Sequence, residues 1–171
     1  MHSSKIIYAA YGSNMLKERF ILYIYGGIFN NKSYKGCNDK TDPISLGYIY
    51  IPHRLYFAKN SSSWDNGGVA FLSRKEEKIF NNYSIVRLWE INEEQFYDIW
   101  IQEGKHSFYP YLLKLGEIKG IEILTFTGDW ENEINEPSES YIEIIKKGIK
   151  ETTGWNKIQI NSYIKKVLND L

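Results

Sequence analysis

The chain has 171 residues, and its Lys+Arg and Asp+Glu counts are 21 each, so its formal net charge is zero at pH 7. This length is most simply one domain with one substantial core, and the charge balance argues against a dedicated nucleic-acid or membrane-surface binder. The single cysteine, Cys37, permits no internal disulfide and favours a reducing, cytoplasmic location. No apolar run approaches ~20 residues, and "MHSSKIIYAAYGS" lacks the basic-then-apolar plan of a signal peptide, so neither a membrane span nor a secretory leader is expected.

The first predicted element is a strand that begins in "IIYAA" and stops at Gly12-Ser13-Asn14. Ile and Tyr favour strands, whereas Gly, Ser and Asn favour turns and caps. The following "MLKERFILYIYGG" predicts a helix that begins at about Leu16 and ends at Gly26-Gly27. A strand that turns sharply into a helix leaves backbone N–H groups without partners, and these groups point at one place.

Residues 30–43, "NNKSYKGCNDKTDP", are polar and rich in turn formers, and they predict the longest loop of the protein. Loops of ~12–15 residues are usually functional lids or mobile connections. We therefore expect a lid or a mobile connection here.

The rest of the chain predicts strands first and helices late. Strands are predicted in "SLGYIYIPHRLYFA", "GGVAFLS" and "YSIVRLWEI", and a hairpin in "YPYLLKLGEI" with "GIEILTFTG". A short helix in "NEEQFYDIWIQEG" has Asn92 as its N-cap and Gly104 at its end, and two helices follow in "PSESYIEIIKKGIKE" and "NKIQINSYIKKVLNDL". With few βαβ units, this order indicates the α+β class.

The sequence carries no signature of a metal or cofactor site. The histidines, His2, His53 and His106, are too scattered for a ligand pair, so no metal is predicted. Phosphate-cradling glycine loops and the nucleophile elbow are missing from the sequence as well. Cys37 lies in the polar segment without a nucleophile signature.

The first candidate site is the turn Tyr11-Gly12-Ser13-Asn14-Met15. Converging N–H groups at the positive end of a helix, with a glycine that lets a ligand approach the backbone, form a ready site for an anion or an oxyanion. The plainer interpretation is a strand-to-helix turn with Ser or Asn as its cap, and the two interpretations share one geometry.

The second candidate is Glu103, at the end of the predicted helix and just before Gly104. A carboxylate beside Trp100 and Phe108 could lose hydration and become suited to moving protons. The plainer interpretation is an exposed glutamate at a helix end.

Four segments in the same order resemble the γ-glutamyl cyclotransferase-like family. They are "YAAYGSNM", "SSSWDNGGVAF", "QEG" followed by Tyr109, and "PSESYIEIIKKG". Each segment is weak alone, but their common order and separations extend the resemblance over most of the chain. The second segment has one residue more between Trp64 and its two glycines than the family pattern.

The resemblance implies a mixed, mostly antiparallel β-barrel-like sheet flanked by helices, in a single domain over residues 1–171 with one pocket. It implies an enzyme of glutathione or γ-glutamyl metabolism that releases an amine or amino acid from a small γ-glutamyl compound as 5-oxoproline forms, without a cofactor. Glu103 is implied as the acid/base. The implied substrate-binding residues are Tyr11, Gly12, Ser13, Asn14, Met15, Tyr109 and Tyr141. A loop insertion at about residues 24–46 exceeds what simple members need, which leaves the leaving amine open, and a homodimer is left open too.

In such a reaction the α-amine of the substrate attacks its own γ-carbonyl, so no enzyme nucleophile is needed. Glu103 would take the proton of the amine and return one to the leaving group, while the amides of the glycine turn stabilise the oxyanion. Two other functions stay open on the sequence. One is a non-catalytic module that binds a small acid or a peptide end, and the other is single-stranded nucleic-acid binding, against which the zero net charge counts.

Overall fold

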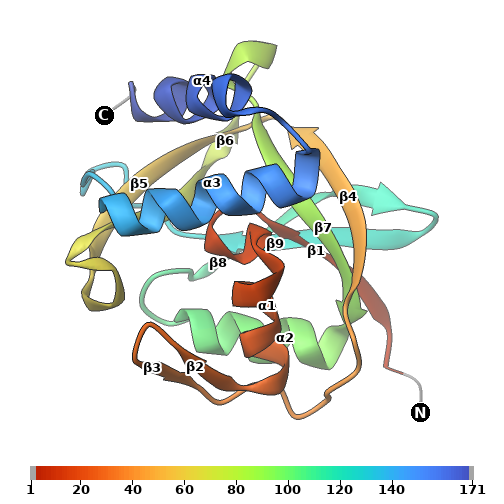
Figure 1. Ribbon diagram of the computed structural model, residues 1–171. Coiled ribbons are helices and arrows are strands. Elements are labelled where there is room, and N and C mark those ends of the chain that lie inside the picture. The colour runs from red at the N-terminus through yellow and green to blue at the C-terminus, as the bar shows by residue number, and fades with distance from the viewer. Residues whose placement is uncertain (1–2, 170–171) are drawn as a thin grey trace.

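The computed structural model describes residues 3–169 (Figure 1). Its strands are β1 (Lys5–Ala10), β2 (Gly27–Phe29), β3 (Lys32–Tyr34), β4 (Ile44–Ile51), β5 (His53–Ser61), β6 (Gly67–Glu76), β7 (Ser84–Asn92), β8 (Tyr111–Ile118) and β9 (Ile121–Thr127). Its α-helices are α1 (Lys17–Tyr25), α2 (Glu93–Glu103), α3 (Glu139–Thr153) and α4 (Lys157–Leu168), and its 3-10 turns are η1 (Ser13–Met15), η2 (Ser62–Trp64) and η3 (Phe80–Asn82).

The main sheet has five strands in the order β4-β7-β1-β9-β8. The pairing of β1 with β9 is parallel and the other pairings are antiparallel, which confirms the predicted α+β class with a mixed, mostly antiparallel sheet. A second sheet, β5-β6, lies beside the first, and the hydroxyl of Thr127 joins the two because it hydrogen bonds both the amide and the carbonyl of Leu72. Within residues 3–169 the strands do not form one closed sheet, so "barrel-like" describes the fold only loosely.

The central strand β1 is buried at every position after Lys5 because both of its faces are covered. Aromatic rings fill the space between β1 and the helices: Phe20 of α1 stacks on Trp89 of β7 with ring centroids 4.7 Å apart, and Tyr8 stacks on Phe126 of β9 at 5.5 Å. Such ring pairs add to the free energy gained from burial. They hold the C-terminal end of β1 and the start of α1 in one fixed arrangement.

Caps place the helix ends where the sequence predicts them. Asn92 and Gln95 form a capping box at the start of α2, and Gly104 ends this helix in the left-handed conformation. Ser138 accepts a hydrogen bond from the amide of Tyr141 at the start of α3. The two late helices and the β8–β9 hairpin are confirmed as well.

The prediction of one long loop over residues 30–43 is wrong. Part of the segment forms the β2–β3 hairpin, whose turn residues Asn30 and Asn31 have φ of 47° and 62°. Paired Asn residues with positive φ suit a two-residue hairpin turn. The following stretch is held against α2, because the buried side chain of Gln95 donates to the carbonyls of Asp39 and Thr41.

Figure 1 shows how the helices frame one region of the molecule, with α3 crossing above η1 and α1, and α2 below them. Gly148 of α3 permits this close approach, since a Cβ there would lie 2.8 Å from the amide nitrogen of Leu16. The helix therefore presses directly on the turn that follows β1. Within residues 3–169, no helix is long and apolar enough to cross a membrane.

Candidate active site

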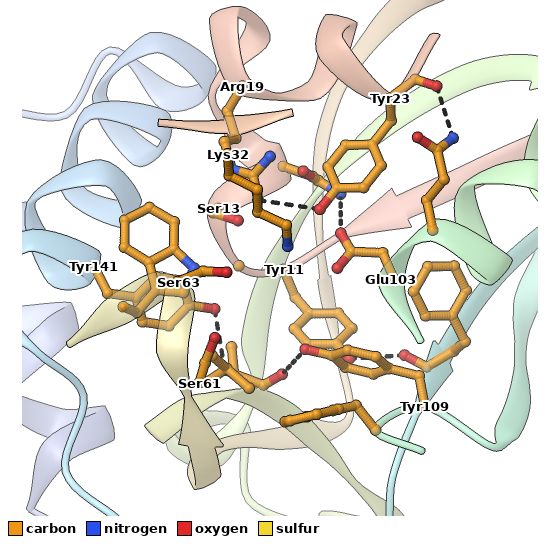
Figure 2. A pocket seen from close by; sticks show the side chains of 18 of the residues that line it. Tyr11, Ser13, Arg19, Tyr23, Lys32, Ser61, Ser63, Glu103, Tyr109 and Tyr141 are labelled. Atoms are coloured by element: carbon orange, nitrogen blue, oxygen red, sulfur yellow. Dashed lines mark hydrogen bonds between the residues drawn. The ribbon is translucent and has the colours of Figure 1, made fainter. Parts of the chain in front are cut away.

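A cavity of about 130 Å³ opens where β1, η1, the C-terminal end of α2 and the start of β6 meet. Figure 2 shows side chains from these elements converging on it. Among the predicted site residues, those that line the cavity are Tyr11, Gly12, Ser13, Asn14, Glu103, Tyr109 and Tyr141. Met15 is outside the lining, because its side chain is buried under Gly148 of α3 and its amide donates to the carbonyl of Gly12.

Glu103 comes from the end of α2, and its carboxylate contacts the turn that follows β1 directly. Asn14 donates from Nδ2 to Oε1 of Glu103 at 2.7 Å, although the two residues are 89 positions apart in the chain. The carbonyl of Asn14 accepts from the indole nitrogen of Trp89 at 3.2 Å, which fixes its backbone. The side-chain oxygen of Asn14 is buried and has no hydrogen-bond partner among the described residues. An acceptor without a donor thus lies next to the carboxylate.

Gln102 helps to fix the position of Glu103. Its side chain donates to the carbonyl of Tyr23 at 3.0 Å and accepts from the amide of Gly36 at 3.1 Å. The "QEG" segment therefore joins α2 to α1 and to the residues that follow the β2–β3 hairpin. This contact holds the end of α2, and with it the carboxylate, against the cavity.

The turn after β1 has backbone amides without protein acceptors, and its residues line the cavity. The amides of Met15 and Leu16 close the 3-10 turn by donating to the carbonyls of Gly12 and Ser13. The amides of Gly12, Ser13 and Asn14 donate to no protein acceptor within residues 3–169. These three groups belong to the turn and η1, since α1 begins only at Lys17. The turn lies directly before α1, as predicted, and its residues Gly12, Ser13 and Asn14 line the cavity.

Arg19 is a cavity residue that the sequence analysis missed. It is only 3% exposed, and its guanidinium lies against aromatic rings that include Tyr34 at 4.6 Å and Tyr23 at 5.0 Å. Desolvation lowers the pKa of Arg19. The electrostatic interactions with Tyr23 and Glu103 raise it by more, so this pKa is raised overall. Nη2 donates to the hydroxyl of Tyr23, whereas Nε and Nη1 have no partner among the described residues. A usable signal existed: position 19 falls on the apolar face of the helix, four residues before Tyr23.

Two tyrosine hydroxyls hydrogen bond to the backbone of β6 in another wall of the cavity. Tyr109 donates to the carbonyl of Ala70 at 3.2 Å, and Tyr141 accepts from the amide of Ala70 at 3.1 Å. Burial raises the pKa of Tyr109 and of Tyr141 well above the ordinary value, so both are neutral. Because Tyr141 accepts from an amide, its own hydrogen is left to donate.

Gly68 explains why the "GG" of the sequence matters for this wall. A Cβ at this position would lie 2.1 Å from the carbonyl oxygen of Asn135. The start of β6 can therefore touch the segment that leads into α3, which places Tyr141 against Ala70.

The remaining lining residues, which were not among the predicted site residues, are Tyr8, Tyr23, Lys32, Ser61, Ser63, Trp64, Val69, Ala70, Gln102, Phe108 and Phe126. Lys32 is a second cation at the cavity and comes from the β2–β3 hairpin (Figure 2). Within residues 3–169, no cluster of three or more His, Cys, Asp or Glu side chains is arranged to hold a metal ion; His2 lies outside the described residues.

Solved structures share this architecture. One is a γ-glutamyl cyclotransferase, with a TM-score of 0.69 and 20% identity, and another is an uncharacterized protein from Homo sapiens, with a TM-score of 0.68 and 21% identity. Each alignment covers 94% of this chain and 87% of the other. The chain has the γ-glutamyl cyclotransferase-like fold. YkqA from Bacillus subtilis shares this γ-glutamyl cyclotransferase-like fold at a TM-score of 0.62 and 18% identity, over 98% of this chain and 55% of its own.

No protein-family profile matches the chain. Among curated proteins, histone deacetylase 5 of Arabidopsis thaliana is 29% identical over 95% of this chain. The chain spans 30% of the length of that protein. The similarity therefore concerns only one part of the plant protein.

Proposed function

We propose that the protein is a cyclotransferase that releases an amine or amino acid from a small γ-glutamyl compound and forms 5-oxoproline. The observation that carries this proposal is the hydrogen bond of 2.7 Å between Asn14 and Glu103, which holds a carboxylate beside the cavity-lining turn at residues 12 to 14, whose amides have no protein acceptor. A proton carrier and oxyanion donors beside one another in one cavity are the parts that this reaction needs. The fold supports the same assignment.

The unpaired groups of the cavity complement the α-amino-acid end of a glutamyl group. Glu103 and the unpartnered oxygen of Asn14 can together accept hydrogen bonds from an ammonium group. Nε and Nη1 of Arg19 are unpaired donors on a planar cation, and each can donate a charge-assisted hydrogen bond to a carboxylate. Buried polar atoms without partners are costly, so their presence on both sides indicates a ligand that pairs with both.

The chemistry follows from this placement. Glu103 takes a proton from the α-ammonium, and the free amine attacks the γ-carbonyl carbon of the same molecule. The amides of residues 12–14 bind the oxyanion of the tetrahedral intermediate, and one such donor is worth about 3 kcal/mol. The C–N bond to the leaving group then breaks as Glu103 returns the proton to the departing nitrogen. The attacking nitrogen is still cationic after the attack; it gives its extra proton to the freed carboxylate of Glu103, which passes it to the released amine and is regenerated. The lactam of 5-oxoproline stays behind, and no enzyme side chain forms a covalent bond.

The Glu103→Gln variant tests this role. Glutamine keeps an oxygen that can accept from Asn14 but cannot carry the proton, so we expect kcat for 5-oxoproline release to fall by at least about 100-fold. Release is measured by chromatography on a panel of γ-glutamyl amines and γ-glutamyl amino acids. Glu94→Gln, an exposed change on the same helix, is the control and should keep its activity. Full activity of folded Glu103→Gln would remove this residue from the mechanism, and no product from the wild-type protein across the panel would contradict the proposed function.

The second candidate is a non-catalytic binding module on the same fold. One observation favours it. The stretch that resembles this chain makes up only 30% of the plant deacetylase, as one module of a larger protein would. This module would be stabilised against heat by γ-glutamyl compounds without consuming them. The deacetylase activity itself is not carried over, because most of that protein lies outside the match. The expected lack of a nucleic-acid partner, the cytoplasmic location and the insertion at residues 24–46 stay predictions, and the homodimer stays open.

A further inference from the structure

Lys32 is a cation at the mouth of the cavity that the proposed chemistry does not use. It follows the Asn30-Asn31 turn of the β2–β3 hairpin, opposite Phe29 in the strand register. Figure 2 shows its side chain extending past Arg19 toward the space in front of Glu103. Its ammonium group can therefore meet a part of a substrate that lies outside the glutamyl head.

The hairpin is held in place over the cavity by ring contacts on both of its strands. Phe29 of β2 meets Trp64 at 6.4 Å between ring centroids, and Tyr34 of β3 meets Tyr23 of α1 at 5.1 Å. Both hairpin rings also lie against the guanidinium of Arg19. The backbone of Lys32 is thus fixed relative to the cavity, and only its own side chain has freedom.

Lys32 has no acidic partner within residues 3–169, and the contact of its ammonium is with the ring of Tyr34, at 5.3 Å. The pKa of Lys32 is lowered overall, because desolvation and the nearby charge of Arg19 lower it by more than the charge of Glu103 raises it. The attraction of an anion bound beside Lys32 would offset both the desolvation of its ammonium and the repulsion from Arg19. The site therefore favours a ligand with a negative charge at this position.

Charge matching then distinguishes the classes of substrate. A glutamyl head carries one ammonium and one carboxylate, which Glu103 and Arg19 complement, so Lys32 is left as an additional cation. The leaving group of a γ-glutamyl amine brings no charge to balance it, whereas an amino acid brings a carboxylate. Resting on the proposed function, we infer that Lys32 binds the carboxylate of the departing amino acid and makes γ-glutamyl amino acids better substrates than γ-glutamyl amines.

A pair of substrates that differ only in this carboxylate tests the inference: γ-glutamyl-L-alanine and γ-glutamyl-ethylamide. We expect the wild-type protein to prefer the alanine compound about threefold to fivefold in kcat/KM, as for a partly exposed charge pair. Lys32→Met should remove the preference by raising KM for the alanine compound while kcat stays unchanged, because the contact is equal in ground and transition states. Lys32→Arg should restore it, and added salt should weaken it. Lys35→Met, an exposed lysine of the same segment outside the cavity lining, is the matched control and should behave as wild type.

A loss that is equal for both substrates in Lys32→Met would overturn the inference, since Lys32 would then act on the glutamyl head. A binding measurement separates this failure from failure of the proposed function. Glutaryl-L-alanine and glutaryl-ethylamide lack the α-amine and cannot cyclise, so their Kd values by calorimetry report recognition alone. If the wild-type protein turns over neither γ-glutamyl substrate, the proposed function is contradicted. A Kd preference for glutaryl-L-alanine that Lys32→Met abolishes would still support the role of Lys32, and equal Kd values would overturn it.

Discussion

Arg19 and Arg87 are both buried, but their hydrogen bonding differs. Arg87 donates to the carbonyl of Met15 at 2.7 Å and to the hydroxyl of Ser45, and it forms an ion pair with Glu151. Arg19 leaves two of its nitrogens without protein partners at the cavity. A buried cation with all its partners contributes to the fold, whereas one with unpaired donors lowers stability until a ligand binds. We therefore assign Arg87 to the fold and Arg19 to the ligand.

Methionine substitutions separate these two assignments. Arg19→Met should leave the free energy of unfolding unchanged or raise it by about 1 kcal/mol, because an apolar side chain replaces an incompletely paired buried cation. The same variant should bind 5-oxoproline about 100-fold more weakly, since the carboxylate loses its partner. Urea unfolding and calorimetric titration measure the two effects.

Arg87→Met is the contrasting variant. It leaves the carbonyl of Met15 and the carboxylate of Glu151 without their donor, so we expect a loss of about 3 kcal/mol in the free energy of unfolding. If Arg19→Met were destabilised to the same extent and kept its affinity for 5-oxoproline, Arg19 would be a structural residue.

At the scale of elements, the contact between α3 and η1 positions the cavity residues of the turn. Gly148 lets the helix touch the turn, since a Cβ there would lie 2.8 Å from both the amide nitrogen of Leu16 and the Cβ of Met15. The neighbouring residues Ser13 and Asn14 line the cavity. A shift of α3 would therefore move the donors away from Glu103.

Gly148→Ala tests this packing. Alanine is the better helix former by about 1 kcal/mol, yet we expect the variant to lose about 1–3 kcal/mol in the free energy of unfolding because the turn is overpacked. Its kcat/KM for 5-oxoproline release should fall together with stability. Lys147→Ala, an exposed change one residue earlier, controls for helix propensity alone. A Gly148→Ala protein that is stabilised and fully active would show that the close contact does not position the site.

At the scale of the whole molecule, buried tyrosines make the free energy of unfolding depend on pH in the alkaline range. The chain has 14 tyrosines, and burial raises the pKa of Tyr56 and of Tyr163 to about 12. Burial likewise raises the pKa of Tyr8, Tyr11 and Tyr23 far above the ordinary value near 10. Above pH 10 these tyrosines stay protonated in the folded state and ionise in the unfolded state. The unfolded state then binds fewer protons, so stability must fall as pH rises.

We expect these tyrosines to leave the free energy of unfolding unchanged below pH 10. Between pH 10 and pH 12 the free energy of unfolding should decrease. Absorbance at the tyrosinate band and far-ultraviolet circular dichroism, recorded along one pH titration, check this. One fraction of the tyrosines should ionise while the helices persist, and the rest should ionise only as the helices are lost. Complete ionisation near pH 10 with the helices intact would contradict the prediction.

Much of the fold could be predicted from the sequence because its signals are local. Strand and helix periodicity, the Asn92 cap and the Gly104 stop need only neighbouring residues, and the structure confirms them. The β2–β3 hairpin was missed because its strands have three residues each, too short to show an alternating pattern. Its stability comes from Phe29 and Tyr34 against the charge of Arg19, which are contacts outside the hairpin.

The sequence by itself determined the α+β class, the helix ends and the turn at residues 12–14, since each depends on residues close together in the chain. Only the tertiary structure decided that Asn14 meets Glu103 across 89 positions, that Arg19 is left with unpaired donors, and that Lys32 reaches the same cavity from a hairpin. The physical reason is that a site is formed by burial and pairing between distant segments. Whether a charged side chain is satisfied there depends on every element packed around it.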